Sequence, residues 1–152
     1  VARADTICQV LAAGDLPGTY YAWISDNNNL PTSNAAARIG GAQDSPTATY
    51  VMPNGGSPVA ANWNELVESG PQVPIVRDES GEEVEELPTH VWTNTSTAGL
   101  SLGHPSCDNW TSNADAGWVG ITVVGESWTN HNSGFCNLEF MHLYCIQGKA
   151  KP

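Results

Sequence analysis

Four cysteines limit the folds open to this chain more than any other feature of its sequence. Cys8 lies near the start and Cys145 near the end, with Cys107 and Cys136 between them. None has C-x-x-C spacing, and His104 with Cys107 is the only near-motif for a metal site, so disulfides are favoured over metal ligation. Four cysteines allow three pairings, and the residues alone leave the choice open. Disulfides indicate an oxidising environment, outside the cell or at its surface.

Size and composition favour a single domain over residues 1–152. Hydrophobic residues make up 40% of the chain, and six Trp and four Tyr supply much of their bulk. Gly (15 residues) and Pro (10 residues) are frequent, so turns and loops should be abundant. We therefore expect a modest core that depends on cross-links for part of its stability.

The charge balance excludes several kinds of partner. Asp and Glu number 16 against five Lys and Arg, which gives a formal net charge of −11. The bases are scattered along the chain: Arg3, Arg38, Arg77, Lys149 and Lys151. Without a basic patch, nucleic acid, heparin and anionic lipid are poor candidates. No apolar stretch approaches the roughly 20 residues of a membrane span. Because the chain starts at Val1 rather than Met, we expect a removed leader or a piece of a longer protein.

Helix and strand signals alternate through the first part of the chain. A capping-box pattern at Thr6 and Gln9 predicts a helix that ends at Gly14 and leaves Cys8 half-buried. Its apolar stripe should face the core: Ile7, Val10 and Leu11. Strands are expected at residues 18–25 and 49–52, and short helices at residues 33–39 and 62–67, with Asn62 as the N-cap of the second.

The second part has fewer clear signals. Residues 73–76 and 90–93 have strand character, and the last strand is expected at residues 138–147. Residues 96–137 look like one long, mostly irregular loop, with a strand inside it at residues 117–124.

An acidic run lies between the expected strands, from Asp78 to Glu86, and has six acids in nine residues. Such density opposes packing and predicts a solvated loop. The alternative is a calcium site built from carboxylate oxygens, although the run lacks the spaced Asp/Asn-Gly pattern of a calcium loop.

The order of landmarks along the chain resembles an endostatin-like domain. The landmarks are Cys8, Gly-Asp-Leu-Pro-Gly-Thr-Tyr-Tyr-Ala-Trp-Ile-Ser at 14–25, Val-Pro-Ile-Val at 73–76, Val-Trp-Thr at 91–93, Cys-Asp-Asn-Trp-Thr at 107–111, Cys136 and Leu-Tyr-Cys at 143–145. The resemblance runs from about Ala4 to Ile146 and is to the bacterial branch of the superfamily, found in secreted and surface-anchored proteins. It implies a C-type-lectin-like α+β fold with a short N-terminal helix, a small mixed sheet and a long loop region. It also implies nested disulfides, Cys8–Cys145 outside and Cys107–Cys136 inside.

The resemblance does not supply an activity, because the functional residues of the better-known relatives are missing. The animal relatives bind zinc through N-terminal histidines and heparin through clustered arginines, and this chain has neither. The calcium lectins carry Glu-Pro-Asn or Gln-Pro-Asp, which do not occur, and Trp-Asn-Asp, which Trp-Thr-Asn at 128–130 only faintly resembles. No hydrolase, metalloprotease, P-loop or dinucleotide motif is present, so we do not expect an enzyme and predict no cofactor.

The best candidate for a contact surface is the long loop region. Its aromatic residues are Trp110, Trp118, Trp128 and His131. Indole rings offer flat apolar faces, and the many Asn, Ser and Thr around them offer hydrogen bonds, a combination suited to a glycan or a protein. The alternative is that these tryptophans only pack the loop onto the sheet. Asn94 and Asn109 lie in N-glycosylation sequons.

We therefore expect an extracellular or surface-displayed binding or adhesion module that binds a protein or glycan ligand. The first alternative is a structural subunit that assembles with copies of itself into a fibre or coat. An enzyme is a distant third.

Overall fold

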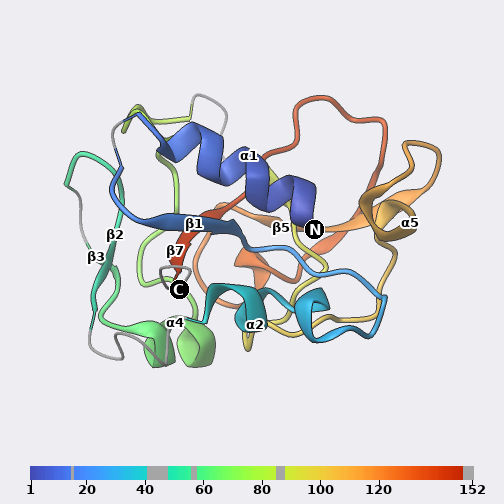
Figure 1. Ribbon diagram of the computed structural model, residues 1–152, viewed down its shortest axis with the longest axis horizontal. Helices are drawn as coiled ribbons and strands as arrows, with labels where there is room; N and C mark the ends of the chain where they lie inside the picture. The colour runs from blue at the N-terminus through green and yellow to red at the C-terminus, as the bar shows by residue number, and fades with distance from the viewer. Residues whose placement is uncertain (15, 41–47, 56–57, 85–87, 149–152) are drawn as a thin grey trace.

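The computed structural model describes residues 1–14, 16–40, 48–55, 58–84 and 88–148. Helix α1 (Ala2–Ala12) opens the chain and lies along strand β1 (Thr19–Ala22), as Figure 1 shows. The helix begins at Ala2, not at Thr6, so the predicted capping box is wrong. Thr6 lies inside the helix, where its hydroxyl donates to the Ala2 carbonyl at 3.0 Å. Gln9 instead accepts a hydrogen bond from the Tyr20 N–H of β1 at 2.9 Å.

The face of α1 that packs inward is not the predicted apolar stripe. Cys8 is wholly buried rather than half-buried, and Asp5 accepts a hydrogen bond from the Ala22 N–H at 2.9 Å. Ile7, Val10 and Leu11 are 44%, 67% and 44% exposed. The prediction was wrong because the buried face of α1 carries Cys8 and Ala12 instead of this stripe. Asp5 and Gln9 bond this face to β1, and Cys8 links it to Cys145 of β7.

Short elements follow β1 and build the first side of the core. They are η1 (Pro31–Ser33), α2 (Ala35–Ile39), β2 (Tyr50–Val51), β3 (Pro58–Ala60) and α4 (Trp63–Ser69). Gly40 ends α2 in the left-handed region at φ 61°, as expected of a glycine stop. Asn62 caps α4 as predicted, since its side chain accepts from the Glu65 N–H at 3.0 Å. Residues 73–76, in contrast, form no strand, and only an isolated bridge joins Arg77 to Glu83.

The region predicted as a long loop contains most of the largest sheet. This sheet has the order β4–β5–β6, where β4 is His90–Trp92, β5 is Ala116–Ile121 and β6 is Asn132–Phe135. All its pairs are antiparallel. The short helix α5 (Cys107–Trp110) and the 3₁₀ turn η2 (Glu126–Trp128) lie in the same region. The strand expected at residues 117–124 is present as β5, whereas β6 was not predicted.

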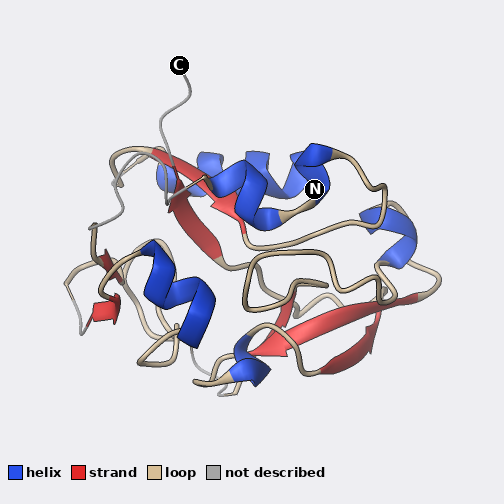
Figure 2. Ribbon diagram, turned by 90° about the horizontal axis from the view of Figure 1, so that it is seen from below, coloured by secondary structure: helices blue, strands red, loops and turns tan. Residues whose placement is uncertain are grey.

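The last strand is shorter than predicted. Strand β7 spans Cys145–Gly148 and pairs antiparallel with β1, while His142 makes only an isolated parallel bridge to Val91. The described strands thus form three small antiparallel sheets, β1–β7, β2–β3 and β4–β5–β6, instead of one mixed sheet. Figure 2 shows these strands in separate groups, with helices and loops between them.

Two disulfides and an aromatic core hold these pieces together. Cys8 is bonded to Cys145 and Cys107 to Cys136, which is the nested pattern that the resemblance implied. The main core is built around Trp23, whose ring lies 4.8 Å from that of Trp128 and 6.0 Å from that of Trp63. A second cluster gathers around Cys8 and Ile24 under α1. The structure is therefore a mixed α+β fold with small sheets.

Candidate contact surface

The chain around Cys107 adopts a left-handed turn. All four residues of α5 have positive φ: Cys107 50°, Asp108 49°, Asn109 55° and Trp110 67°. Left-handed conformations cost non-glycine residues roughly 1–2 kcal/mol each, and Asn and Asp tolerate them best. The surrounding structure must therefore hold this turn in place.

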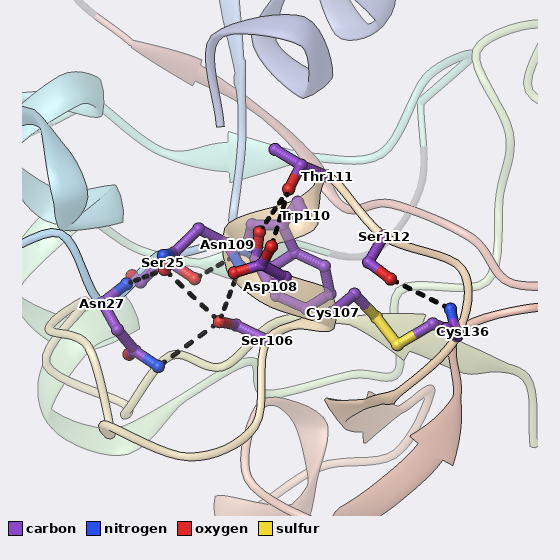
Figure 3. The surroundings of a disulfide bond; sticks show 11 residues. Ser25, Asn27, Ser106, Cys107, Asp108, Asn109, Trp110, Thr111, Ser112 and Cys136 are labelled. Carbon is purple, nitrogen blue, oxygen red and sulfur yellow. Dashed lines mark hydrogen bonds between the residues drawn. A yellow bond between two sulfur atoms is a disulfide. The ribbon is translucent and has the colours of Figure 1, made fainter.

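Bonds on two sides of the turn hold it, as Figure 3 shows. On one side Cys107 is joined to Cys136, which immediately follows β6. On the other side the Asn109 side chain accepts from the Asn27 N–H at 2.8 Å, and the Trp110 indole donates to the Ser25 carbonyl at 2.8 Å. The disulfide and these bonds fix the turn between the segment after β1 and the edge of the largest sheet.

A buried polar network lies beneath this turn. Ser25, Thr93, Asn94, Thr95 and Thr129 are each fully buried. The Thr95 hydroxyl donates to the Thr93 carbonyl at 2.7 Å, and the Thr129 hydroxyl donates to the Thr95 carbonyl at 2.7 Å. Satisfied buried networks of this kind give a rigid, specific packing. The network also helps to hold the left-handed turn above it in place.

Asp26, next to this network, is a buried carboxyl group. Burial by itself raises its pKa, but hydrogen bonds from the Ser33 side chain and the Asn28 N–H outweigh that effect. The net result is a pKa below the usual value. Asp26 is therefore ionised at neutral pH and serves to fix the turn that follows it.

Trp118, on β5, is the predicted contact residue that best fits a surface role. Its ring stacks on His104 with centroids 4.1 Å apart, and its indole N–H donates to the Asn130 side chain at 2.8 Å. Asn130 in turn donates to the Glu126 carboxylate at 2.8 Å. Trp118 and His104 are both half-buried. We call the group Trp118, His104, Asn130 and Glu126 the Trp118 platform.

The other predicted contact residues have different positions. Trp128 is wholly buried against Trp23 and Tyr144, so its assignment to a contact surface is wrong. Its indole N–H has no hydrogen-bond partner among the described residues.

Trp110 is half-buried against Trp92, with ring centroids 5.6 Å apart, and its indole N–H donates within the protein. His131 is exposed and follows the platform residue Asn130, with its ring 6.4 Å from that of His90.

The sequons differ in how accessible their asparagines are. Asn94 is wholly buried and donates to the Ser25 carbonyl and the Asn27 side chain, so the folded protein does not expose it to glycosylation. Asn109 is half-buried, and its side-chain oxygen accepts from Asn27. These asparagines therefore serve the packing around the turn.

The acidic run forms a local turn rather than a ligand cage. One Asp78 carboxylate oxygen accepts from the Ser80 hydroxyl at 2.7 Å and from the N–H groups of Ser80 and Glu82 at 2.9 Å. The Ser80 hydroxyl and these backbone groups lower the pKa of Asp78. Within the described ranges, no three His, Cys, Asp or Glu side chains gather to hold a metal. Glu85 and Glu86, which belong to the run, lie outside the described residues.

Sequence reasoning missed the left-handed turn, strand β6 and the buried network. The Asp-Asn pair at 108–109 was an available signal for left-handed backbone. The network offered no local signal, because its members come from distant segments.

No known family model matches the sequence, and no curated protein matches it either. None of the helices among the described residues is long and apolar enough to cross a membrane.

Proposed function

We propose that this chain is a non-catalytic binding or adhesion module of the extracellular space or cell surface, with an endostatin-like, C-type-lectin-like fold. The nested disulfides support this fold, because they join the chain ends and staple the segment that carries β5 and β6. They are compatible with an extracellular location. The expected partner is a protein or a glycan, whereas the net charge of −11 disfavours nucleic acid and heparin.

The observation that carries the proposal is the Trp118 platform. A half-buried indole, its N–H already bonded to Asn130, presents an apolar surface without an unpaired donor. Aromatic side chains held in this way lose little entropy on binding and serve as anchors in interfaces. The disulfide and the buried network beneath make the platform rigid before any ligand arrives.

Matched tryptophan variants test the proposal. Purified protein is screened against immobilised oligosaccharides and extracellular-matrix proteins, and each variant is compared with the wild type on every positive probe. Trp118→Ala should abolish binding while the midpoint of urea unfolding changes little. Trp128→Ala should reduce stability by about 3–5 kcal/mol, because it empties a core site. Binding that survives Trp118→Ala, together with a large loss of stability, would show that Trp118 is only a packing residue.

A structural subunit of a fibre or coat is the second candidate. The observation that favours it is the edge of β6, which pairs with no strand except β5 among the described residues and where Phe135 is 73% exposed.

A further inference from the structure

Strand β6 forms an edge of the largest sheet. Among the described residues its only strand partner is β5, and Asn132, Ser133 and Phe135 are exposed. The Cys136 N–H donates to the Asp115 carbonyl at 2.8 Å, so alternate residues back along the strand, Gly134 and Asn132, turn their backbone groups towards β5. By the same alternation, Ser133 and Phe135 turn their backbone N–H and C=O groups away from β5. The Phe135 carbonyl accepts from the Leu138 N–H at 3.2 Å in the turn that follows, and it keeps a second lone pair for a further donor.

This edge is short, but it lacks the charged residues and the proline that usually prevent edge-to-edge pairing. Proteins protect exposed edges with Lys, Pro, inward charges or bulges. Residues 127–138 read Ser-Trp-Thr-Asn-His-Asn-Ser-Gly-Phe-Cys-Asn-Leu and contain no Asp, Glu, Lys, Arg or Pro. The acids Glu126 and Glu139 begin only beyond its two ends.

The same stretch is one at which two copies of this chain can meet without bringing acids of the strand together. At a net charge of −11, most approaches between copies bring acid against acid. An uncharged edge strand that can still donate and accept backbone hydrogen bonds is an exception, because hydrogen bonding there does not require carboxylates to meet. This charge pattern favours a second copy over a strand from a strongly charged partner.

We propose that β6 pairs antiparallel with β6 of a second copy about a twofold axis at Gly134, which joins the two β4–β5–β6 sheets into one. Ser133 of each copy then exchanges backbone hydrogen bonds with Phe135 of the other, and the two Gly134 residues lie opposite each other on the axis. Such self-complementary pairing forms a closed dimer.

The side-chain positions fit this arrangement. A Cβ on Gly134 would point inward, 3.6 Å from Met141, Trp92 and Val119. Gly134 therefore places no side chain on the face of the sheet that carries Ser133 and Phe135. Ser133 lies opposite Trp118 in the β5–β6 register, and Phe135 lies opposite Ala116. Pairing would therefore place Phe135 of one copy beside Ser133 of the other, on the face that carries the Trp118 platform. The dimer does not depend on the ligand binding proposed above, and it gives the structural-subunit alternative a defined contact.

Sedimentation velocity without any ligand tests this proposal. Wild-type protein should shift from monomer to dimer as its concentration rises, and more readily in 0.5 M than in 0.05 M NaCl, because roughly a threefold shorter Debye length screens the acidic surfaces. Ser133→Lys should remain monomeric because it places a charge in the interface. Asn64→Lys has the same net charge at an exposed site on helix α4 and should dimerise like the wild type.

A backbone variant separates pairing from surface charge. Ser133→Pro removes the outward N–H but leaves the bonds of Asn132 and Gly134 to β5, so it should fold and remain monomeric. In the wild type, hydrogen exchange at Ser133 and Phe135 should slow as concentration rises. A wild type that stays monomeric at every soluble concentration in high salt would overturn the proposal. Dimerisation of Ser133→Lys or Ser133→Pro to the wild-type extent would do the same. Because no ligand is used, these outcomes leave the Trp118 platform to its own test.

Discussion

Asp108 has a backbone conformation that glycine adopts more easily. Its φ is 49° and its ψ 59°, within a run of four left-handed residues. Its side chain is exposed and accepts a long, 3.5 Å bond from the Thr111 hydroxyl. The same hydroxyl donates a shorter bond, 2.6 Å, to the Asp108 carbonyl, which glycine keeps. Asp108→Gly should therefore raise the free energy of unfolding by up to about 1 kcal/mol.

Asp115→Gly is the matched control for this substitution. Asp115 is also exposed and loses the same charge, but it is not among the residues with positive φ. There glycine should destabilise by roughly 0.5–1 kcal/mol, because it only adds freedom to the unfolded chain. Urea unfolding followed by tryptophan fluorescence measures both variants. Equal destabilisation by the two would mean that the left-handed turn stores no strain at Asp108.

The fates of single residues show where sequence reasoning works and where it does not. Asn62 was predicted correctly because an N-cap depends on the three residues that follow it. Trp118 and Trp128 could not be distinguished, since both lie in polar, glycine-containing sequence. Their burial depends on distant partners, Trp23 for Trp128 and His104 for Trp118.

At the scale of elements, Arg38 of α2 connects three segments. Its guanidinium donates to the Asp5 carboxylate of α1 at 2.9 Å, to the Ala22 and Ile24 carbonyls at 2.8 Å and to the Thr32 carbonyl at 3.1 Å. The Arg38 side chain is 6% exposed and that of Asp5 is 17% exposed. A nearly buried cation bonded to three segments in this way fixes α1, β1 and η1 relative to one another.

Arg38→Met should destabilise the fold by about 3–5 kcal/mol, because it leaves the Asp5 carboxylate and several carbonyls without their donor. The double variant Asp5→Asn/Arg38→Met should recover part of this loss, since it no longer buries an unpaired charge. Calorimetric melting of both variants and of Asp5→Asn gives the coupling free energy. Additive effects of the two single substitutions would show that the ion pair does not join α1 to α2.

Predictions of elements succeeded where the signal was local and strong. The strand expected in the aromatic run at 18–25 is present over Thr19–Ala22, and the strand expected at 90–93 is present as His90–Trp92. Strand β6 was missed because Asn-Ser-Gly-Phe has low strand propensity and forms through pairing with β5. The helix start was misplaced because the helix extends upstream of Thr6 to Ala2, so the residues of the capping-box pattern lie inside the helix. The acidic stretch at 85–86 lies outside the described residues.

At the scale of the whole molecule, the small separate sheets make the cross-links important. The described strands have between two and six residues and form no continuous sheet. Each sheet alone is too small to be stable in water, so packing between sheets and covalent links must supply the cooperativity. Cys8–Cys145 joins α1 to β7, whereas Cys107–Cys136 joins the left-handed turn to the end of β6.

The two disulfides should therefore contribute unequally. Cys8 and Cys145 are 137 residues apart and Cys107 and Cys136 are 29 apart. On the chain-entropy model these loops correspond to about 5 and about 3.6 kcal/mol. Loss of the inner bond should cost less than its loop length implies, because the left-handed residues at 107–110 can then relax to ordinary backbone.

Paired serine variants test this difference. Cys8→Ser/Cys145→Ser should lower the urea midpoint the most and release α1, seen as fast hydrogen exchange at residues 2–12. Cys107→Ser/Cys136→Ser should keep α1 protected, lose protection around Trp110, and lower the midpoint by a smaller amount. Mapping of unreduced peptides from the wild type provides the control for the pairing itself. If the inner variant were destabilised as much as the outer one, the strain in the left-handed turn would not offset the loss of the bond, and the turn would have to be a relaxed part of the fold.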